Sequence, residues 1–412
     1  MSQQPARIDD LSSPRFAPEV AEVHGLMGSM AADLPLTSES LHAAATAQTG
    51  LDDFGPQDYR ERLDVLLGAL NDIPGATNWG RVIVHTQLVQ LLKNRALLQR
   101  LLRDHPEIHE VELAPPVIIA GLPRTGTTHL HNLLAASGLY RTLPYWESLE
   151  PFPLPSESGT SPDPRRERCD QGIDFLHQNL PLFPLMHEMT TDHVHEEIQL
   201  LANDFSSMLF ETLADVPAWR DYYLEHDQEP HYRHLRLQLQ ALQFLDGGKR
   251  WLLKSPQHLE QLPTLARVFP DATVALTHRD PARVAVSMAT MVAYSRRMTT
   301  DPVDAVGTGR YWSDRLDAML TTLVHDRDRV RDLTCTDVRF DDFIADELGT
   351  AASVIQLAGG VVTDVACDNM AGYLETHVRG RLGTIDYRAE DLGLDIDELR
   401  TRFEPYSARF LV

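Results

Sequence analysis

The spacing of hydrophobic positions changes along the chain, and the change separates a helical first part from a mixed second part. Residues 58–72 and 79–106 carry apolar side chains three and four positions apart, the spacing that predicts amphipathic helices. A shorter helix with a polar start is predicted at 38–50, and an extended segment at 10–20. Together these elements predict a helical N-terminal extension over residues 1–114.

Short apolar runs alternate with helical patterns in the second part. The predicted strands are 117–120, 250–256, 272–279 and 335–340, and the helices predicted among them are 257–269 and 281–298. This alternation predicts an α/β fold, in which helices cover both faces of a parallel sheet. Residues 164–246 carry several more helical patterns, and the Pro- and Ser-rich stretch 149–168 predicts an exposed loop.

The chain of 412 residues is expected to form one domain, 1–412, because no internal repeat or linker divides it. We expect a core at 115–405 with a helical insertion at 150–246. Apolar residues make up 43% of the chain and charged residues 24%, a composition that allows a sizeable globular core.

The chain is strongly acidic, with a formal net charge of −23 at pH 7. This charge disfavours nucleic acid and anionic membranes as partners, so an anionic ligand would need a local cluster of arginines and backbone N–H groups. The first residues lack the pattern of a secretory signal. No apolar run approaches the roughly 18–20 residues that a membrane span needs. We therefore expect no integral membrane segment.

The cysteines lack paired spacing, which argues against a disulfide framework or a zinc site and favours the cytoplasm: Cys169, Cys335 and Cys367.

Arginine replaces lysine at most basic positions. Among 37 basic residues, lysine occurs only as Lys93, Lys249 and Lys254. The bias suggests a bacterium with a GC-rich genome, and it makes each remaining lysine a candidate for a specific role.

The stretch GLPRTGTT, residues 121–128, follows the first predicted strand and precedes a helix. Gly121 and Gly126 have the G-x-x-x-x-G spacing of a phosphate-binding loop, but the lysine that follows the second glycine in nucleotide triphosphatases is absent. The N-terminal end of the helix would attract an anion. Candidate donors in the loop are Arg124, Thr125, Thr127 and Thr128. The same spacing without a ligand would be a tight strand-to-helix turn, and the arginine and threonines favour the phosphate site.

A magnesium-dependent phosphotransferase would also need an aspartate at the end of a neighbouring strand. The best candidate strand ends at Arg279, and Asp280 lies beyond it, where we expect it to cap the next helix. Arg279 and Ser287 could converge on a second phosphate some distance from the first, although such a pair alone is more often a surface salt bridge and a solvated hydroxyl. A phosphate site without an evident metal ligand points away from a kinase.

Four motifs occur in a fixed order within residues 115–405: GLPRTGTTHL, WLLKSPQHLEQLPTLARVFPDATVALTHRDP, HRDPARVAVSM and RGRLGTIDYRAEDLGLDIDELRTRFEPY. In these motifs the chain resembles the sulfotransferases that use 3′-phosphoadenosine 5′-phosphosulfate (PAPS), above all a bacterial branch. The resemblance implies a P-loop-type α/β fold and no metal ion. It implies that the 5′ end of the nucleotide is held by Arg124, Thr125, Gly126, Thr127 and Thr128, and the 3′-phosphate by Arg279 and Ser287, under a late loop with Arg379 and Gly380. Many cytosolic members have lysine in place of Arg124.

Lys254, which ends a predicted strand, is the candidate cation for the bridging oxygen of the donor, with Arg124 as its helper. The alternative is a lysine paired with a surface carboxylate.

The acceptor hydroxyl also needs a general base. The bacterial branch has an acidic pair at the place of Glu196 and Glu197, although acids in the first turn of a helix also complement its dipole. His258, four residues after Lys254, is a rival, because cytosolic members have a catalytic histidine close after their lysine. In those members the spacing is two residues. His195 is a third choice.

These features predict a cytoplasmic bacterial sulfotransferase that moves a sulfuryl group in line from PAPS to a hydroxyl of a small lipophilic molecule or glycolipid. The helical insertion could supply a lipophilic acceptor pocket from Tyr145, Trp146, Phe183, Met186, Phe205 and Met208. The alternatives are a small-molecule kinase that uses ATP and magnesium with the same loop, and a nucleotide-binding protein without catalysis.

Overall fold

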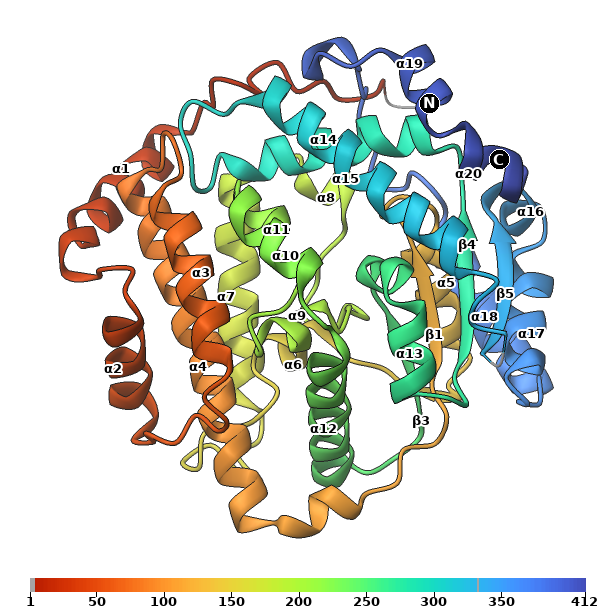
Figure 1. The fold of residues 1–412 in the computed structure, drawn as a ribbon, viewed down its shortest axis with the longest axis horizontal. Coiled ribbons are helices and arrows are strands. Elements are labelled where there is room, and N and C mark those ends of the chain that lie inside the picture. The colour runs from red at the N-terminus through yellow and green to blue at the C-terminus, as the bar shows by residue number, and fades with distance from the viewer. Residues whose placement is uncertain (1–3, 332) are drawn as a thin grey trace.

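A parallel sheet of five strands lies beside a group of N-terminal helices (Figure 1) in the computed structural model, which describes residues 4–331 and 333–412. The strands stand in the order β2-β3-β1-β4-β5, and all neighbouring pairs are parallel, as predicted. The strands are β1 (Val117–Gly121), β2 (Tyr140–Arg141), β3 (Arg250–Lys254), β4 (Thr273–His278) and β5 (Thr334–Arg339).

Helices make up most of the remaining chain, and short 3-10 helices are marked η. They are α1 (Pro18–Ser29), η1 (Ala31–Asp33), α2 (Ser38–Thr49), α3 (Tyr59–Asn71), α4 (Asn78–Asp104), η2 (Pro106–Glu110), α5 (Thr127–Ala136), α6 (Tyr145–Leu149), α7 (Pro164–Asn179), α8 (Phe183–Met186), α9 (Ile198–Ala202), α10 (Leu209–Leu213), α11 (Pro217–Glu225), α12 (Glu229–Asp246), η3 (Pro256–Glu260), α13 (Leu262–Val268), α14 (Pro281–Arg296), α15 (Ala305–Asp326), α16 (Phe340–Ala345), α17 (Glu347–Leu357), α18 (Asp364–Thr376), η4 (Glu390–Leu392), α19 (Ile396–Arg402) and α20 (Glu404–Phe410).

Helices cover both faces of the sheet, because successive strand residues point to opposite sides. Val117 and Ile119 of β1 pack in an apolar cluster with residues of α5, α17 and α18. Ile118 and Ala120 belong to a larger cluster with residues of α13, α14 and α15. The near-continuous apolar runs of the strands reflect this burial on two faces.

The predicted strands and helices are confirmed, but some ends differ by a few residues: the predicted strand 250–256 ends at Lys254, and the predicted loop 149–168 is already helical at Pro164. Three further differences concern the elements themselves. The segment predicted as extended at 10–20 is already helical at Pro18, because proline is well suited to the first turn of a helix. The helix predicted at 257–269 is divided at Gln261 into η3 and α13, and Pro263, which lacks an N–H, occupies the first turn of the second piece. The sequence did not predict β2, which has only two residues.

The N-terminal helices share their core with the sheet. In Figure 1 helices α1 to α4, in red and orange, stand at one side, and α12 lies between them and the strands. One apolar cluster contains Leu63 of α3, Leu92 of α4 and Leu253 of β3. The single domain and its division into extension, core and insertion stay predictions. Among the described residues, no helix has the length and apolar character needed to cross a membrane.

Candidate active site

The loop between β1 and α5 has the backbone of an anion-binding turn. Gly126 adopts a φ of 91° and caps α5, and Arg124 adopts a φ of 71° although it carries a side chain. The hydrogen bonds of α5 begin where Leu130 N–H donates to the carbonyl of Gly126. The N–H groups of the first turn therefore have no partner within the helix and are free to bind an anion.

The loop is held in place by the Thr125 side chain and lies close to the ring of Phe340. The Thr125 hydroxyl lies 2.6 Å from both the carbonyl oxygen of Leu122 and the Thr277 hydroxyl, and Thr125 is 1% exposed. Thr125 therefore fastens the turn to β4, whereas the sequence predicted its hydroxyl as a donor to the ligand. At Gly126, an added Cβ would meet the Phe340 ring at 3.0 and 3.2 Å, so this close approach requires glycine.

Three arginines converge beside the loop. Arg124 Nε donates to Ser287 Oγ at 3.2 Å, and Arg279 Nη1 donates to the carbonyl of Arg124 at 2.8 Å. The guanidinium carbons of Arg279 and Arg379 lie 4.2 and 5.2 Å from the centre of the Phe340 ring. Burial, with the like charges of Arg379 and Arg124, lowers the pKa of Arg279. The structure thus brings the predicted residues together, and Ser287 contacts Arg124 of the loop directly.

Nearby carboxylates are paired elsewhere. Asp280 caps α14 by accepting a hydrogen bond from the backbone N–H of Ala282, as predicted, and Glu188 pairs with Arg381. Within residues 4–331 and 333–412, none of the three clustered arginines forms an ion pair with a carboxylate. The cluster therefore retains positive charge that a bound anion can neutralise.

A cavity of about 420 Å³ opens between the loop and a late segment, residues 377–383. Arg124 and Thr128 lie on one wall, and Arg379 and Gly380 lie on another. A third wall belongs to residues 184–194 of the predicted insertion, among them the apolar Pro184, Leu185 and Met186. Three segments far apart in the sequence therefore enclose one space of a size suited to a small ligand.

Lys254 ends β3, the strand beside β1. Its Nζ donates to Thr128 Oγ1 at 3.2 Å and pairs with Glu196. The Lys254 side chain is 1% exposed, and the Glu196 side chain is 18% exposed. The ammonium group thus reaches the first turn of α5 and, through Thr128, the wall of the cavity.

Glu197 follows Glu196 in the sequence but points into the protein interior. One carboxylate oxygen accepts a hydrogen bond from the backbone N–H of Lys254 at 2.8 Å, and the other contacts His258 Nε2. His258 Nδ1 lies 2.8 Å from the Tyr232 hydroxyl. Glu197 is 1% exposed and His258 0%. The sequence offered both residues as general bases, but burial and occupied polar atoms keep them from the cavity, and they support the end of β3 instead.

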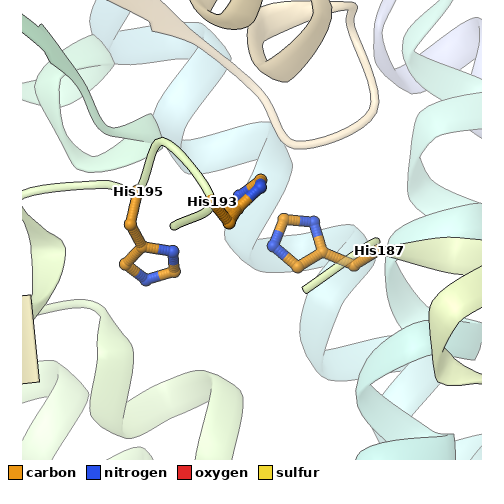
Figure 2. A group of neighbouring side chains, drawn as sticks. All are labelled: His187, His193 and His195. Carbon is orange, nitrogen blue, oxygen red and sulfur yellow. The ribbon is translucent and has the colours of Figure 1, made fainter. Parts of the chain in front are cut away.

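Three histidines meet beside the cavity (Figure 2). One nitrogen from each of His187, His193 and His195 lies within 4.8 Å of the other two. His193 lines the cavity, and burial with the nearby charge of Lys254 lowers its pKa to about 4, so the ring is neutral near pH 7. His195 is 8% exposed and packs 4.6 Å from the Tyr145 ring, and burial holds its pKa well below the usual value.

Sequence reasoning missed several residues of this region. His193 lies in the histidine-rich segment, but nothing there distinguished it from His195. Phe340 immediately follows β5, and that place at the carboxyl end of a parallel strand could have drawn attention to it. Of the apolar residues predicted for the acceptor pocket, Phe205 and Met208 are 0% exposed and belong to the core, whereas Met186 lines the cavity.

The sheet, the glycine loop that leads into α5, and the cationic cavity define a P-loop-type fold with a site suited to binding an anion. The model of the sulfotransferase family matches residues 115–364. The crystal structure of sulfotransferase STF1 from Mycobacterium tuberculosis H37Rv (type1 form) is similar, with 32% sequence identity and a TM-score of 0.78 over 90% of this chain and 99% of that one. The fold also resembles that of sulfotransferase STF9 from Mycobacterium avium, with 24% identity and a TM-score of 0.81 over 92% of this chain and 97% of that one. No curated protein sequence matches the chain.

The chain therefore belongs to the sulfotransferase family and is an enzyme of that class. Membership confirms the resemblance and the P-loop-type fold inferred from the sequence, and it implies a sulfonate donor and a small-molecule acceptor.

Proposed function

We propose that this protein transfers a sulfuryl group from PAPS to the hydroxyl of a small lipophilic molecule or glycolipid. The observation that carries the proposal is the unpaired cluster of Arg124, Arg279 and Arg379 beside the N-terminus of α5. A donor with phosphates at both ends of one adenosine would neutralise this charge from two directions.

The loop and the arginine cluster would hold opposite ends of the donor. The first-turn N–H groups of α5, with Thr127 and Thr128, would bind the 5′-phosphosulfate. Arg279, Ser287 and the late segment with Arg379 and Gly380 would bind the 3′-phosphate. The Phe340 ring, which both guanidinium groups approach, would keep Arg279 and Arg379 in position.

The reaction would be an in-line displacement at sulfur. The acceptor oxygen forms a bond to sulfur while the bond from sulfur to the bridging oxygen breaks, and the electron pair remains on the departing 5′-phosphate. Lys254 would stabilise the charge that develops on this oxygen. Glu196, which is partly exposed beside Lys254 Nζ, would accept the proton of the acceptor hydroxyl. Binding of the donor would draw Lys254 toward the bridging oxygen and release the carboxylate for this role.

The wall formed by residues 184–194 would receive the acceptor. Pro184, Leu185 and Met186 make it partly apolar, which suits a lipophilic alcohol or the lipid part of a glycolipid better than a charged peptide. A panel of lipophilic alcohols, glycolipids and peptides, incubated with labelled donor, would test this preference, and faster transfer to peptides would contradict it.

Calorimetric titration tests the choice of nucleotide. We expect adenosine 3′,5′-bisphosphate to bind one-to-one and more tightly than ATP with magnesium, because the strands beside β1 end in Lys254 and His278 rather than in a carboxylate that could hold the metal. Tighter binding of ATP with magnesium would instead support the kinase alternative.

A further inference from the structure

We propose that His187, His193 and His195 form a binding site for a divalent transition metal ion of the Zn²⁺ type, with a fourth coordination position open toward the cavity (Figure 2). The sequence predicted no metal site, and three histidines without a shared motif spacing gave no reason to expect one. The proposal goes beyond the sulfuryl transfer proposed above and does not depend on it.

The backbone places the side chains of His193 and His195 on the same face of their segment. His193 and His195 are two positions apart in a segment that runs antiparallel to Pro144, and the side chains of such alternate residues point to the same face. The carbonyl of His193 accepts a hydrogen bond from Tyr145 N–H at 2.9 Å, and His195 N–H donates to the carbonyl of Leu143 at 2.7 Å. These contacts hold both residues in position before any ligand binds.

His187 completes the group from another element. It follows α8 directly, its N–H donates to the carbonyl of Phe183, and it lies on the side of His193 away from His195 (Figure 2). Its ring centre lies 5.4 Å from that of His193, and the His193 and His195 ring centres lie 5.7 Å apart. In tetrahedral coordination, Zn–N bonds of about 2.0–2.1 Å place the ligand nitrogens about 3.3 Å apart. The three histidine nitrogens now lie within 4.8 Å of one another, so small rotations of the rings would bring them to the distance that Zn²⁺ needs.

Free ring nitrogens support a metal rather than a hydrogen-bonded cluster. His193 Nε2 and His195 Nδ1 are buried and have no hydrogen-bond partner among the residues that the structure describes. A buried polar atom without a partner costs free energy, which a metal–nitrogen bond would offset.

The charge around the site permits a cation. Two cationic side chains lie near these rings: Lys254, which is paired with Glu196, and Arg124, which acts on His187. Glu188 and Asp192 line the same cavity, and each is paired with an arginine, Arg381 and Arg166 respectively. Three neutral imidazoles with an open fourth position are the ligand set of a zinc ion that can still bind water or another oxygen ligand.

Titration of the metal-free, full-length protein with Zn²⁺ against a chromophoric chelator tests the proposal. We expect one Zn²⁺ per chain, and at least about 10- to 100-fold weaker binding for His187→Ala and His193→Ala, because each loses a direct ligand. The matched control is His109→Ala, an exposed histidine of η2, which should bind Zn²⁺ like the wild type. No saturable one-to-one binding by the wild type, or unchanged binding by both ligand variants, would overturn the proposal.

Two further readouts keep the test decisive if an alanine variant unfolds. His193→Gln preserves most of the side-chain volume and should still lose affinity. Co²⁺ bound to the wild type should show the intense visible bands of four-coordinate geometry, and the weak bands of six-coordinate Co²⁺ would contradict the site. Because no nucleotide or acceptor is present, failure here leaves the titration with adenosine 3′,5′-bisphosphate as a separate test of the proposed function.

Discussion

The phosphate loop and the histidine- and glutamate-rich segment face each other across one cavity, but they are built in different ways. The loop, residues 121–128, offers mainly backbone: Gly126 in a left-handed conformation and the open first turn of α5. The opposite segment, residues 187–197, offers side chains whose positions depend on distant partners such as Lys254.

Anion binding and proton transfer, the roles proposed for the two segments, place different demands on a chain. An anion can be held by any row of N–H groups, so a few adjacent residues suffice. A general base must be the right carboxylate in the right place, and here two consecutive glutamates point to different environments. Glu196 reaches Lys254 Nζ, whereas Glu197 is buried against His258.

The largest effect is expected from Lys254→Ala. Without the ammonium group, charge on the departing oxygen is not stabilised, and kcat should fall about 10²- to 10³-fold while binding of adenosine 3′,5′-bisphosphate changes little. Steady-state kinetics and calorimetry measure the two quantities. Lys249→Ala is the control, because Lys249 is exposed and its ammonium group donates to the carbonyl of Gly138, away from the cavity. A variant with more than a tenth of the wild-type kcat would show that Lys254 is not the required cation.

Substitution by glutamine should lower turnover at Glu196 and stability at Glu197. Glu196→Gln should lower kcat about 10²-fold with little change in stability, because it removes a base from a partly exposed position. Glu197→Gln should lower the free energy of unfolding by about 1–3 kcal/mol, because it disturbs a buried carboxylate bonded to Lys254 N–H and His258.

Chemical denaturation and turnover, measured on both glutamate variants, give the comparison. If both variants lost kcat equally and kept the stability of the wild type, Glu196 and Glu197 would not have the separate roles expected here.

Arg279→Ala tests the cluster beside the loop. Loss of a charged hydrogen-bond donor to the 3′-phosphate should weaken adenosine 3′,5′-bisphosphate about 10- to 100-fold and leave adenosine 5′-phosphate unaffected. Arg283→Ala, whose side chain is 72% exposed nearby, should bind both nucleotides like the wild type. Equal weakening of both nucleotides by Arg279→Ala would place this arginine elsewhere on the donor.

The smallest effect is expected from Gly126→Ala, which tests the backbone contribution. A side chain at a φ of 91° is strained and would press on Phe340, so we expect a loss of about 1–3 kcal/mol in stability and about tenfold weaker bisphosphate binding. Gly50→Ala is a matched control, since Gly50 has a φ of 71° and no heavy atom lies within 4 Å of an added Cβ. It should lose stability in thermal unfolding but bind the nucleotide normally. Normal binding by Gly126→Ala would argue against a cradle formed by the loop backbone.

Features that depend on neighbours in the sequence could be predicted. The apolar strand, the two glycines and the arginine in GLPRTGTT indicated the loop, and Asp280 before Pro281 indicated the cap of α14. Features that depend on packing could not. The division of the predicted helix 257–269 and the two-residue strand β2 are examples, because neither leaves a periodic pattern long enough to detect.

The sequence by itself determined the fold class, the parallel sheet and the phosphate loop, because hydrophobic periodicity and turn chemistry act over a few residues. Only the tertiary structure decided which side chains share the cavity. It turned Thr125, Glu197 and His258 inward, and it placed Phe340 against Gly126 although more than two hundred positions separate them. The direction in which a side chain points depends on the strand and helix that pack against it, and this information is distributed along the whole chain.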